Sequence, residues 1–233
     1  MRPRDTVRDV KWWGIEDDDA RRQHFVLGDY DHTAFPRGTR VIDVGCGTGE
    51  QVRSLAAQGC VAVGVDVVLP REAAAQSPGV HLVLARAEHL PFRPGTFDGA
   101  VTKVVLPYTD ETRAVREIGR VLRNGGTWKV TGHGLGYYLD YLLLSPSFKR
   151  RVYALRTIGN TVLYRMTGAR WVLGDSIYQS LACLTRHCAH AGFRITRLTP
   201  APRFLGLPVF LYLRLIVSPA PAASHGNRQR HVA

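Results

Sequence analysis

The stretch from Val41 to Glu50 constrains the fold more than any other part of the chain. It joins a mostly apolar run, residues 41–44, to three closely spaced glycines. The run has the composition of a buried strand, and residues 51–58 after the glycines have that of a helix. A glycine turn between a strand and a helix forms a ligand-binding edge, because the absent Cβ lets a ligand approach the backbone and because such turns often need positive φ angles. The stretch therefore predicts an α/β fold with a ligand over this turn.

The spacing of the glycines indicates the class of ligand. Dinucleotide sites use Gly-x-Gly-x-x-Gly and hold a pyrophosphate at the helix N-terminus. Here Gly45, Gly47 and Gly49 follow the pattern Gly-x-Gly-x-Gly, and Glu50 stands where the third glycine of the dinucleotide pattern would be. A carboxylate there would repel a pyrophosphate, so we expect a ligand without phosphate. The alternative is an ordinary glycine-rich turn with no ligand.

The pattern Asp43-x-Gly-x-Gly-x-Gly49 resembles the first motif of the class I S-adenosylmethionine-dependent methyltransferases. Residues 85–92, Ala-Arg-Ala-Glu-His-Leu-Pro-Phe, resemble the second signature of the subgroup that includes quinone-biosynthesis enzymes, in which this segment wraps the adenine. Arg86 departs from that signature, because the family has an aspartate there that accepts a hydrogen bond from the adenine amino group. Arginine cannot accept one, so Arg86 either stacks on the ring or points away and leaves backbone groups near Ala87 to bind the adenine.

The resemblance implies a Rossmann-like, doubly wound sheet of seven mostly parallel strands with an antiparallel closing strand, and S-adenosylmethionine as the cofactor. Asp66 ends the second strand, 17 positions after Gly49, close to the spacing of an acidic residue that accepts hydrogen bonds from ribose hydroxyls. The alternative for Asp66 is a solvated strand end. Lys103 ends the fourth strand and faces either the carboxylate of the methionine moiety or an acidic substrate, unless it is a surface lysine. The expected cofactor-binding residues are Asp43, Gly45, Cys46, Gly47, Thr48, Gly49, Asp66, Val67, Ala87, Glu88, Lys103 and Val104.

The rest of the chain divides around this core. We expect cap helices over residues 1–37, the cofactor-binding core over 38–132, a helical insertion forming a substrate lid over 133–190, closing strands over 191–218 and a disordered tail over 219–233. The insertion is basic, apolar and rich in tyrosine, which suits an aromatic or lipid-like acceptor and would also suit docking on an anionic membrane. A helical dimer interface is the alternative. One apolar helical face is expected from Phe148, Val152, Leu155, Val162, Leu163 and Met166.

Catalytic residues leave a weaker trace in the sequence than the cofactor site. Methyl transfer from a sulfonium requires alignment above all, and a base only for a weak nucleophile. His133 is the candidate base, because it directly follows the predicted fifth strand and therefore lies at the mouth of the site, and because its ordinary pKa is near neutral. A loop histidine that caps a strand end is the alternative. Tyr108, Tyr137 and Tyr138 are candidates for orienting the acceptor.

Charge and cysteine content limit the remaining choices. The net charge of +12 suits an anionic substrate, nucleic acid or a membrane surface without deciding between them. We expect no metal site, because Cys183 and Cys188 have no second cysteine pair to support them, and the cysteine pattern favours a reducing, cytoplasmic setting. The sequence contains no run of about 18 uncharged apolar residues, so we expect no membrane span.

We therefore expect a methyltransferase that modifies a small aromatic, lipid-like or natural-product acceptor by direct displacement, as a monomer or homodimer. An RNA methyltransferase would account for the charge, but no appended RNA-binding module is visible and we expect no nucleic-acid partner. A non-catalytic, methyltransferase-like binding protein is the third possibility, and Arg86 favours it.

Overall fold

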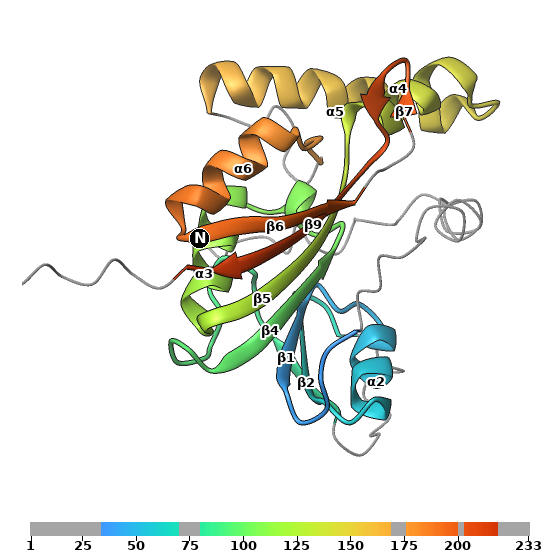
Figure 1. Ribbon diagram of the computed structural model, residues 1–233. Helices are drawn as coiled ribbons and strands as arrows, with labels where there is room; N and C mark the ends of the chain where they lie inside the picture. Colours follow the sequence, from blue (N-terminus) through green and yellow to red (C-terminus); the bar gives the residue numbers. More distant parts are fainter. Residues whose placement is uncertain (1–33, 70–79, 169–175, 200–202, 219–233) are drawn as a thin grey trace, which may run out of the picture.

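A seven-stranded sheet forms the centre of the molecule. The structure, a computed structural model, describes residues 34–69, 80–168, 176–199 and 203–218 (Figure 1). Within these residues the strands of the sheet run in the order β3-β2-β1-β4-β5-β9-β6. They are β1 Arg40–Val44, β2 Val61–Asp66, β3 Val80–Leu84, β4 Phe97–Lys103, β5 Leu122–His133, β6 Phe193–Thr199 and β9 Phe210–Val217.

The pairing confirms the predicted Rossmann-like architecture. The strands β3, β2, β1, β4 and β5 pair in parallel, and β9 pairs antiparallel with both β5 and β6. Parallel strands bring their carboxyl ends to one edge of the sheet, which is where ligands of open α/β sheets bind. The segments that follow β1 to β5 therefore meet at that edge.

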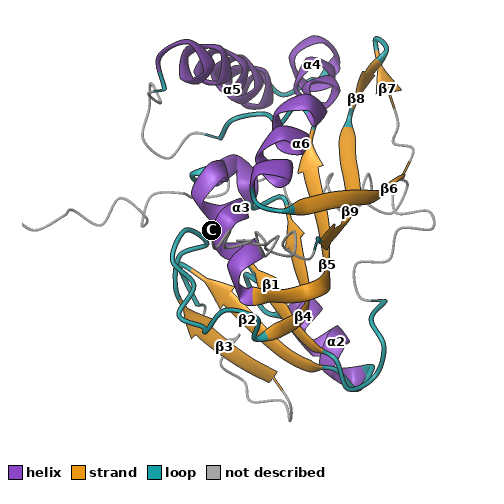
Figure 2. Cartoon of the chain, turned by 60° about the vertical axis from the view of Figure 1, so that its left-hand side comes forward, coloured by secondary structure: helices purple, strands orange, loops and turns teal. Residues whose placement is uncertain are grey.

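Helices cover the two faces of the sheet because the strands are apolar on both sides. Val41 packs with α2, Glu50–Ala57, on one face, whereas its neighbour Ile42 belongs to the larger cluster on the other face. That larger cluster includes α3, Glu111–Val121, and α6, Leu181–His190 (Figure 2). The alternation of successive side chains along a strand thus assigns each helix to its face.

The insertion after β5 begins with two helices that pack on each other. They are α4, Leu135–Leu144, and α5, Phe148–Thr167, and both lie at one end of the molecule together with the short strands β7, Arg203–Phe204, and β8, Leu207–Pro208 (Figures 1 and 2). The third helix, α6, packs against α3 and β6 and contributes Leu184 and Cys188 to the main core.

Several sequence expectations match the elements closely and others fall outside the described residues. Asp110 caps α3, since its carboxylate accepts a hydrogen bond from the Arg113 N–H. Strand β5 begins at Leu122, directly after the last residue of α3, so Asn124 and Gly125 lie within the strand although their composition is typical of a helix end. Of the expected cap region, 1–37, residues 1–33 lie outside the described residues, and so does the expected tail over 219–233. No helix among the described residues is long and apolar enough to cross a membrane.

Candidate active site

The glycine turn between β1 and α2 opens the carboxyl edge of the sheet. Gly45, Gly47 and Gly49 all have positive φ angles, of 80°, 51° and 78°. A Cβ on Gly45 would lie 2.1 Å from a methyl carbon of Val105, so this position also needs glycine for space. The Gly45 N–H donates to the Val65 carbonyl at 2.7 Å, which ties the turn to β2. The turn therefore exposes backbone at Gly47 and Thr48, where a ligand can approach it.

Asp66, the last residue of β2, fixes this turn from the side. Its Oδ2 accepts a hydrogen bond from the Gly47 N–H at 2.8 Å, and its Oδ1 accepts one from the Val68 N–H at 3.1 Å. An ionised carboxylate has about four acceptor sites, so each oxygen can accept one more hydrogen bond. Asp66 can thus hold the turn and still bind two adjacent hydroxyl groups of a ligand.

Asp43 is a buried carboxyl group beside this turn. Its side chain is 2% exposed, and burial together with the nearby Asp66 carboxylate raises the pKa of Asp43 to about 7, against the opposing effect of Lys103. Two carboxyl groups near each other disfavour an anionic ligand and favour a cationic one, because a positive charge would relieve their repulsion. The edge therefore suits a ligand that carries hydroxyls and a positive group rather than a pyrophosphate.

The cysteine of the turn contributes backbone rather than a reactive thiol. Cys46 is buried, and burial and the Asp43 carboxyl group raise the pKa of its thiol to about 12, so the thiol stays protonated. A Cβ added to Gly64 would lie 2.8 Å from the Cys46 Sγ, so the sulfur packs closely against β2. The side chain of Cys46 thus points into the core and leaves its backbone at the turn.

The segment after β3 lies next along the edge. Arg86 is exposed and pairs with Glu88 at 3.5 Å, while Ala87 is buried. Glu88 Oε1 also accepts a hydrogen bond from the Asp110 N–H at 2.9 Å, which connects this segment to the start of α3. Glu88 therefore already has two protein partners, and Arg86 extends toward solvent.

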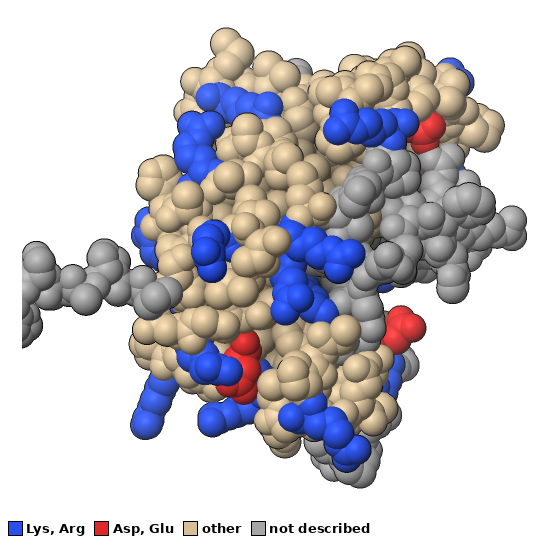
Figure 3. All heavy atoms as spheres, in the orientation of Figure 1, with Lys and Arg blue, Asp and Glu red and all other residues tan. Residues whose placement is uncertain are grey.

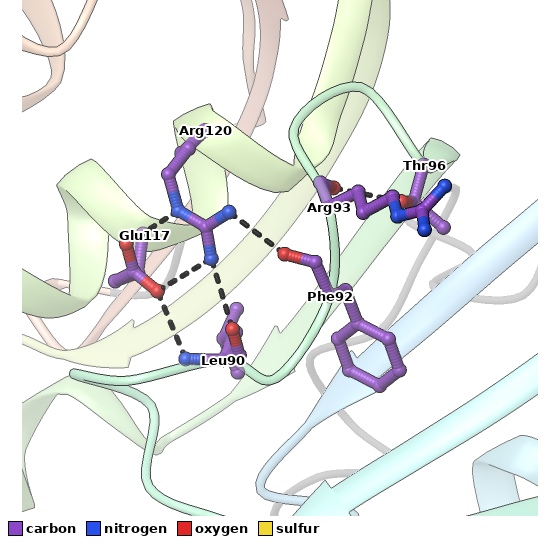
Figure 4. Close-up of polar contacts among 6 residues, drawn as sticks. All are labelled: Leu90, Phe92, Arg93, Thr96, Glu117 and Arg120. Atoms are coloured by element: carbon purple, nitrogen blue, oxygen red, sulfur yellow. Dashed lines mark hydrogen bonds and ion pairs between the residues drawn. The ribbon is translucent and has the colours of Figure 1, made fainter.

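Two residues of α3 that the sequence did not mark for the site clamp the same segment (Figure 4). Glu117 Oε2 accepts from the Leu90 N–H at 2.9 Å, and Arg120 donates to the Leu90 carbonyl at 2.9 Å and the Phe92 carbonyl at 2.7 Å. Arg120 also donates to Glu117, and this hydrogen bond is the main reason why the pKa of Glu117 lies below its ordinary value. The i, i+3 pair on the helix is visible in the sequence, but its backbone partners are not.

The end of β4 carries backbone strain. Val104 has a φ of 57°, which a β-branched side chain rarely adopts, and its N–H donates to the Thr131 carbonyl at 2.9 Å. This conformation follows Lys103 and directs the chain so that Val105 packs against Gly45. The strain thus lies next to the glycine turn.

His133 lies where β5 ends at the carboxyl edge of the sheet, but its side chain is buried. It is the last residue of β5, is 6% exposed, and stacks on Tyr137 with ring centroids 3.9 Å apart. Its Nδ1 is buried and has no hydrogen-bond partner among the described residues, and burial lowers the pKa of His133 to about 3. A ring that binds a proton so weakly stays neutral near pH 7 and is a weak general base.

The three candidate tyrosines belong to the insertion side of the edge. Tyr137 and Tyr138 are buried in the aromatic cluster around His133, and the Tyr137 hydroxyl donates to Tyr141 at 2.8 Å. The Tyr138 hydroxyl lies near Tyr153 without a hydrogen bond of good geometry. Tyr108 is half-buried, and its hydroxyl lies 3.3 Å from that of Tyr153 on α5. Of the three, Tyr108 is the one that joins the end of β4 to the insertion.

The expected residues therefore fall into two groups. The first group lies along the carboxyl ends of β1 to β4 and comprises Asp43, Gly45, Cys46, Gly47, Thr48, Gly49, Asp66, Val67, Ala87, Glu88, Lys103 and Val104. The second lies after β4 and at the end of β5 and comprises Tyr108, His133, Tyr137 and Tyr138. The first group fits S-adenosylmethionine: the turn offers room, Asp66 offers acceptors for ribose hydroxyls, and buried Asp43 offers a site for a positive group.

Comparisons with known proteins agree with this geometry. The family "Methyltransferase domain" matches residues 42–128. An uncharacterised protein of Methanocaldococcus jannaschii is 32% identical over 138 residues, which cover 57% of this chain and 53% of that protein. A demethylmenaquinone methyltransferase of Corynebacterium kroppenstedtii is 37% identical over 90 residues, which cover 38% of this chain and 39% of that enzyme. The chain thus spans about half or less of the length of these relatives.

A solved structure extends the likeness to the fold. The 1,6-didemethyltoxoflavin-N1-methyltransferase of Burkholderia thailandensis, solved with bound 1,6-didemethyltoxoflavin and S-adenosylhomocysteine, superposes with a TM-score of 0.56 at 17% identity. The superposition covers 90% of this chain and 82% of that one. At this identity the likeness concerns the fold, including the strands and helices outside residues 42–128.

Proposed function

We propose that this chain, which carries a methyltransferase domain of the class I fold over residues 42–128, transfers a methyl group from S-adenosylmethionine to a small organic acceptor by direct displacement. The observation that carries the proposal is the pair of carboxyl groups beside a glycine turn. Asp66 has acceptor capacity left for two hydroxyls, and the pKa of buried Asp43 is raised to about 7, which favours a cationic ligand.

The cofactor site follows from these residues. We assign the ribose hydroxyls to Asp66 and the amino group of the methionine moiety to Asp43, and we place the methionine carboxylate toward Lys103. The adenine would lie against the segment from Ala85 to Leu90, which Glu117 and Arg120 hold in place. Because Arg86 replaces the aspartate of the family, backbone groups near Ala87 would bind the adenine amino group.

The protein's part in the reaction is alignment. When bound, S-adenosylmethionine supplies a methyl group on a positively charged sulfur, so the departing thioether is neutral. The chain must hold acceptor, methyl carbon and sulfur in line and exclude water. Alignment alone can lower the activation free energy by about 7–11 kcal/mol. His133 is a weak base at neutral pH, so we propose that it contributes to the reaction through packing rather than through proton transfer.

A small, aromatic or lipid-like acceptor fits the insertion better than a nucleic acid. The insertion side of the edge holds a buried aromatic cluster with Tyr137 and Tyr138, and beside it the half-buried hydroxyl pair of Tyr108 and Tyr153. The Corynebacterium relative is named for a quinone precursor and the Burkholderia structure holds a small heterocycle. Both facts support a small acceptor with an aromatic ring.

The decisive experiment is calorimetric titration of the purified protein with S-adenosylmethionine and S-adenosylhomocysteine. We expect micromolar dissociation constants for the wild type. Asp66→Asn removes the charge that strengthens two hydrogen bonds to ribose, which at about 1.5–3 kcal/mol for a charged bond predicts a dissociation constant at least about tenfold higher. Equal binding by wild type and Asp66→Asn would contradict the assigned ribose site.

Asp98→Asn is the matched control. Asp98 also accepts hydrogen bonds, from the Arg40 N–H at 2.7 Å and from Arg123, but it lies at the amino end of β4, away from the proposed site. We expect this variant to bind the cofactor as the wild type does. If the wild type itself binds no cofactor, the methyltransferase proposal fails, and Arg86→Asp tests whether restoring the family residue restores binding.

Release of S-adenosylhomocysteine then tests the acceptor class. We expect turnover with members of a panel of phenols, quinols and lipid-like acids and none with total RNA. Turnover with RNA and with none of the small molecules, at a rate that falls as the salt concentration rises, would show that the acceptor is RNA rather than a small molecule.

A further inference from the structure

Helix α5 buries polar residues and exposes apolar ones, the reverse of an ordinary surface helix. Its inward side chains are Ala154, Thr157, Asn160 and Thr161. Its outward apolar side chains, which we call the α5 stripe, are Phe148, Val152, Leu155, Val162 and Met166. Phe148, Leu155 and Met166 are 78%, 60% and 80% exposed. A helix built this way leaves its main apolar surface without cover from the described residues.

Hydrogen bonds to residues 176–178 fix α5 in this orientation. Thr157 lies 3.1 Å from the Ser176 hydroxyl, and Asn160 donates to the Ser176 carbonyl at 3.3 Å. Thr161 accepts from the Tyr178 N–H at 2.9 Å. Turning the α5 stripe toward the core would break these buried hydrogen bonds, each of which is costly to leave unmade. The stripe is therefore a fixed outer surface.

Neighbouring elements at the same end of the molecule also expose apolar side chains. The stripe runs from Phe148 to Met166, which is 18 helical steps or about 27 Å at a rise of 1.5 Å per residue. Leu143 and Leu144 at the end of α4 are exposed, and so are Leu205 and Leu207 around the turn between β7 and β8. Helix α4 contacts α5, β7 and β8, and all four elements lie together at one end (Figures 1 and 2).

The charge of α5 is of one sign. The helix contains Lys149, Arg150, Arg151, Arg156 and Arg165 and no aspartate or glutamate. Lys149 and Arg156 project on one side of the α5 stripe and Arg151 on the other, as the 100° advance per residue requires, and all three are exposed. Lys and Arg side chains also border this end of the surface in Figure 3. An apolar band with cations on both sides is the pattern of a helix that lies flat in a membrane interface.

We propose that α5 docks the protein on an anionic lipid surface, with the α5 stripe inserted among acyl chains and the flanking cations against lipid headgroups. Charge complementarity favours lipid over a second copy of the chain, because two α5 helices face to face would bring ten cations together with no carboxylate on either helix. The inference rests on the surface of α5 and stands whether or not the chain transfers methyl groups.

Co-sedimentation of the full chain with vesicles tests this proposal. We expect binding to vesicles of phosphatidylcholine with about one-third phosphatidylglycerol, and at least about tenfold weaker partitioning into phosphatidylcholine alone, since each cation near an anionic surface contributes roughly a fivefold factor. Binding should weaken as salt rises. Failure of the full chain to bind anionic vesicles overturns the proposal.

Matched substitutions locate the docking surface. Leu155→Glu places a carboxylate in the α5 stripe and should lower partitioning into anionic vesicles at least about tenfold. Leu198→Glu, at an exposed leucine on the edge strand β6, is the control and should bind as the wild type. Equal loss in both variants, or no loss in Leu155→Glu, would contradict docking through α5. If the wild type does not bind vesicles but forms a dimer, and Leu155→Glu dissociates that dimer, the α5 stripe mediates self-association instead.

Discussion

The buried carboxyl group of Asp43 makes a quantitative prediction about stability. Its pKa is about 7 in the folded chain and about 3.9 in an unfolded one, and each unit of difference corresponds to 1.36 kcal/mol. A raised folded pKa means that the folded state is most stable while Asp43 is protonated, below pH 4. The ionisation penalty grows between pH 4 and pH 7 and then stays constant at about 4 kcal/mol.

Asp43→Asn removes this penalty, because the amide is neutral at every pH. We expect the free energy of unfolding of the variant, relative to the wild type, to increase by about 3–4 kcal/mol between pH 4 and pH 8. Urea unfolding followed by circular dichroism at a series of pH values measures this difference. A difference that stays flat from pH 4 to pH 8 would refute the reasoning from burial.

Asp98→Asn is the control of opposite sign. Hydrogen bonds from the Arg40 N–H and from Arg123 hold the pKa of Asp98 below its ordinary value. Its ionised form therefore stabilises the fold at neutral pH, and this contribution disappears as acid protonates it. The Asp98 variant should be less stable than the wild type near pH 7, and the two should converge at low pH.

Three further substitutions test separate parts of the site. Gly45→Ala should lower the free energy of unfolding by about 2–4 kcal/mol in urea titrations, because the new methyl meets Val105, whereas Gly125→Ala, with a positive φ and open space, should cost about 1 kcal/mol. Arg120→Ala should cost about 2–3 kcal/mol in the same assay, since it leaves carbonyls of the clamped segment unpaired. His133→Phe should keep kcat within about tenfold, because the neutral ring acts through packing. A kcat reduced more than about 100-fold with cofactor affinity intact would make His133 the base.

The core of the fold was predictable from local sequence. The runs that became β1 and β2 are mostly apolar and short, and the glycines between β1 and α2 predict the turn with its positive φ angles. The end of α3 was harder, because Asn124 and Gly125 have the composition of a helix end although they lie within β5. Pairing with β4 decides that segment, and pairing partners are distant in the sequence.

The insertion shows where sequence periodicity stops being informative. The spacing of Phe148, Leu155 and Met166 identifies one helical face correctly, but it does not say whether that face turns toward the core. The answer depends on Thr157 and Asn160, whose partner Ser176 lies beyond the end of the helix. The clamp of Glu117 and Arg120 was hidden for the same reason, because it binds backbone groups that carry no residue-specific signal.

Features that cost stability gather at one edge of the sheet. Asp43 bears an ionisation penalty at neutral pH, Val104 holds a positive φ, and Gly45 has no Cβ so that Val105 can pack against the turn. The amino edge holds Asp98, which stabilises the fold through its hydrogen bonds. Perturbed pKa values and backbone strain concentrate where a protein binds or reacts.

A cationic ligand beside Asp43 would remove most of the ionisation penalty. The affinity of the protein for this ligand should therefore fall as pH drops below 7 and Asp43 becomes protonated, approaching a tenfold loss per pH unit. Asp43→Asn should bind the ligand weakly at every pH, and a wild-type affinity that is constant from pH 8 to pH 5.5 would show that the ligand does not bind through this carboxylate.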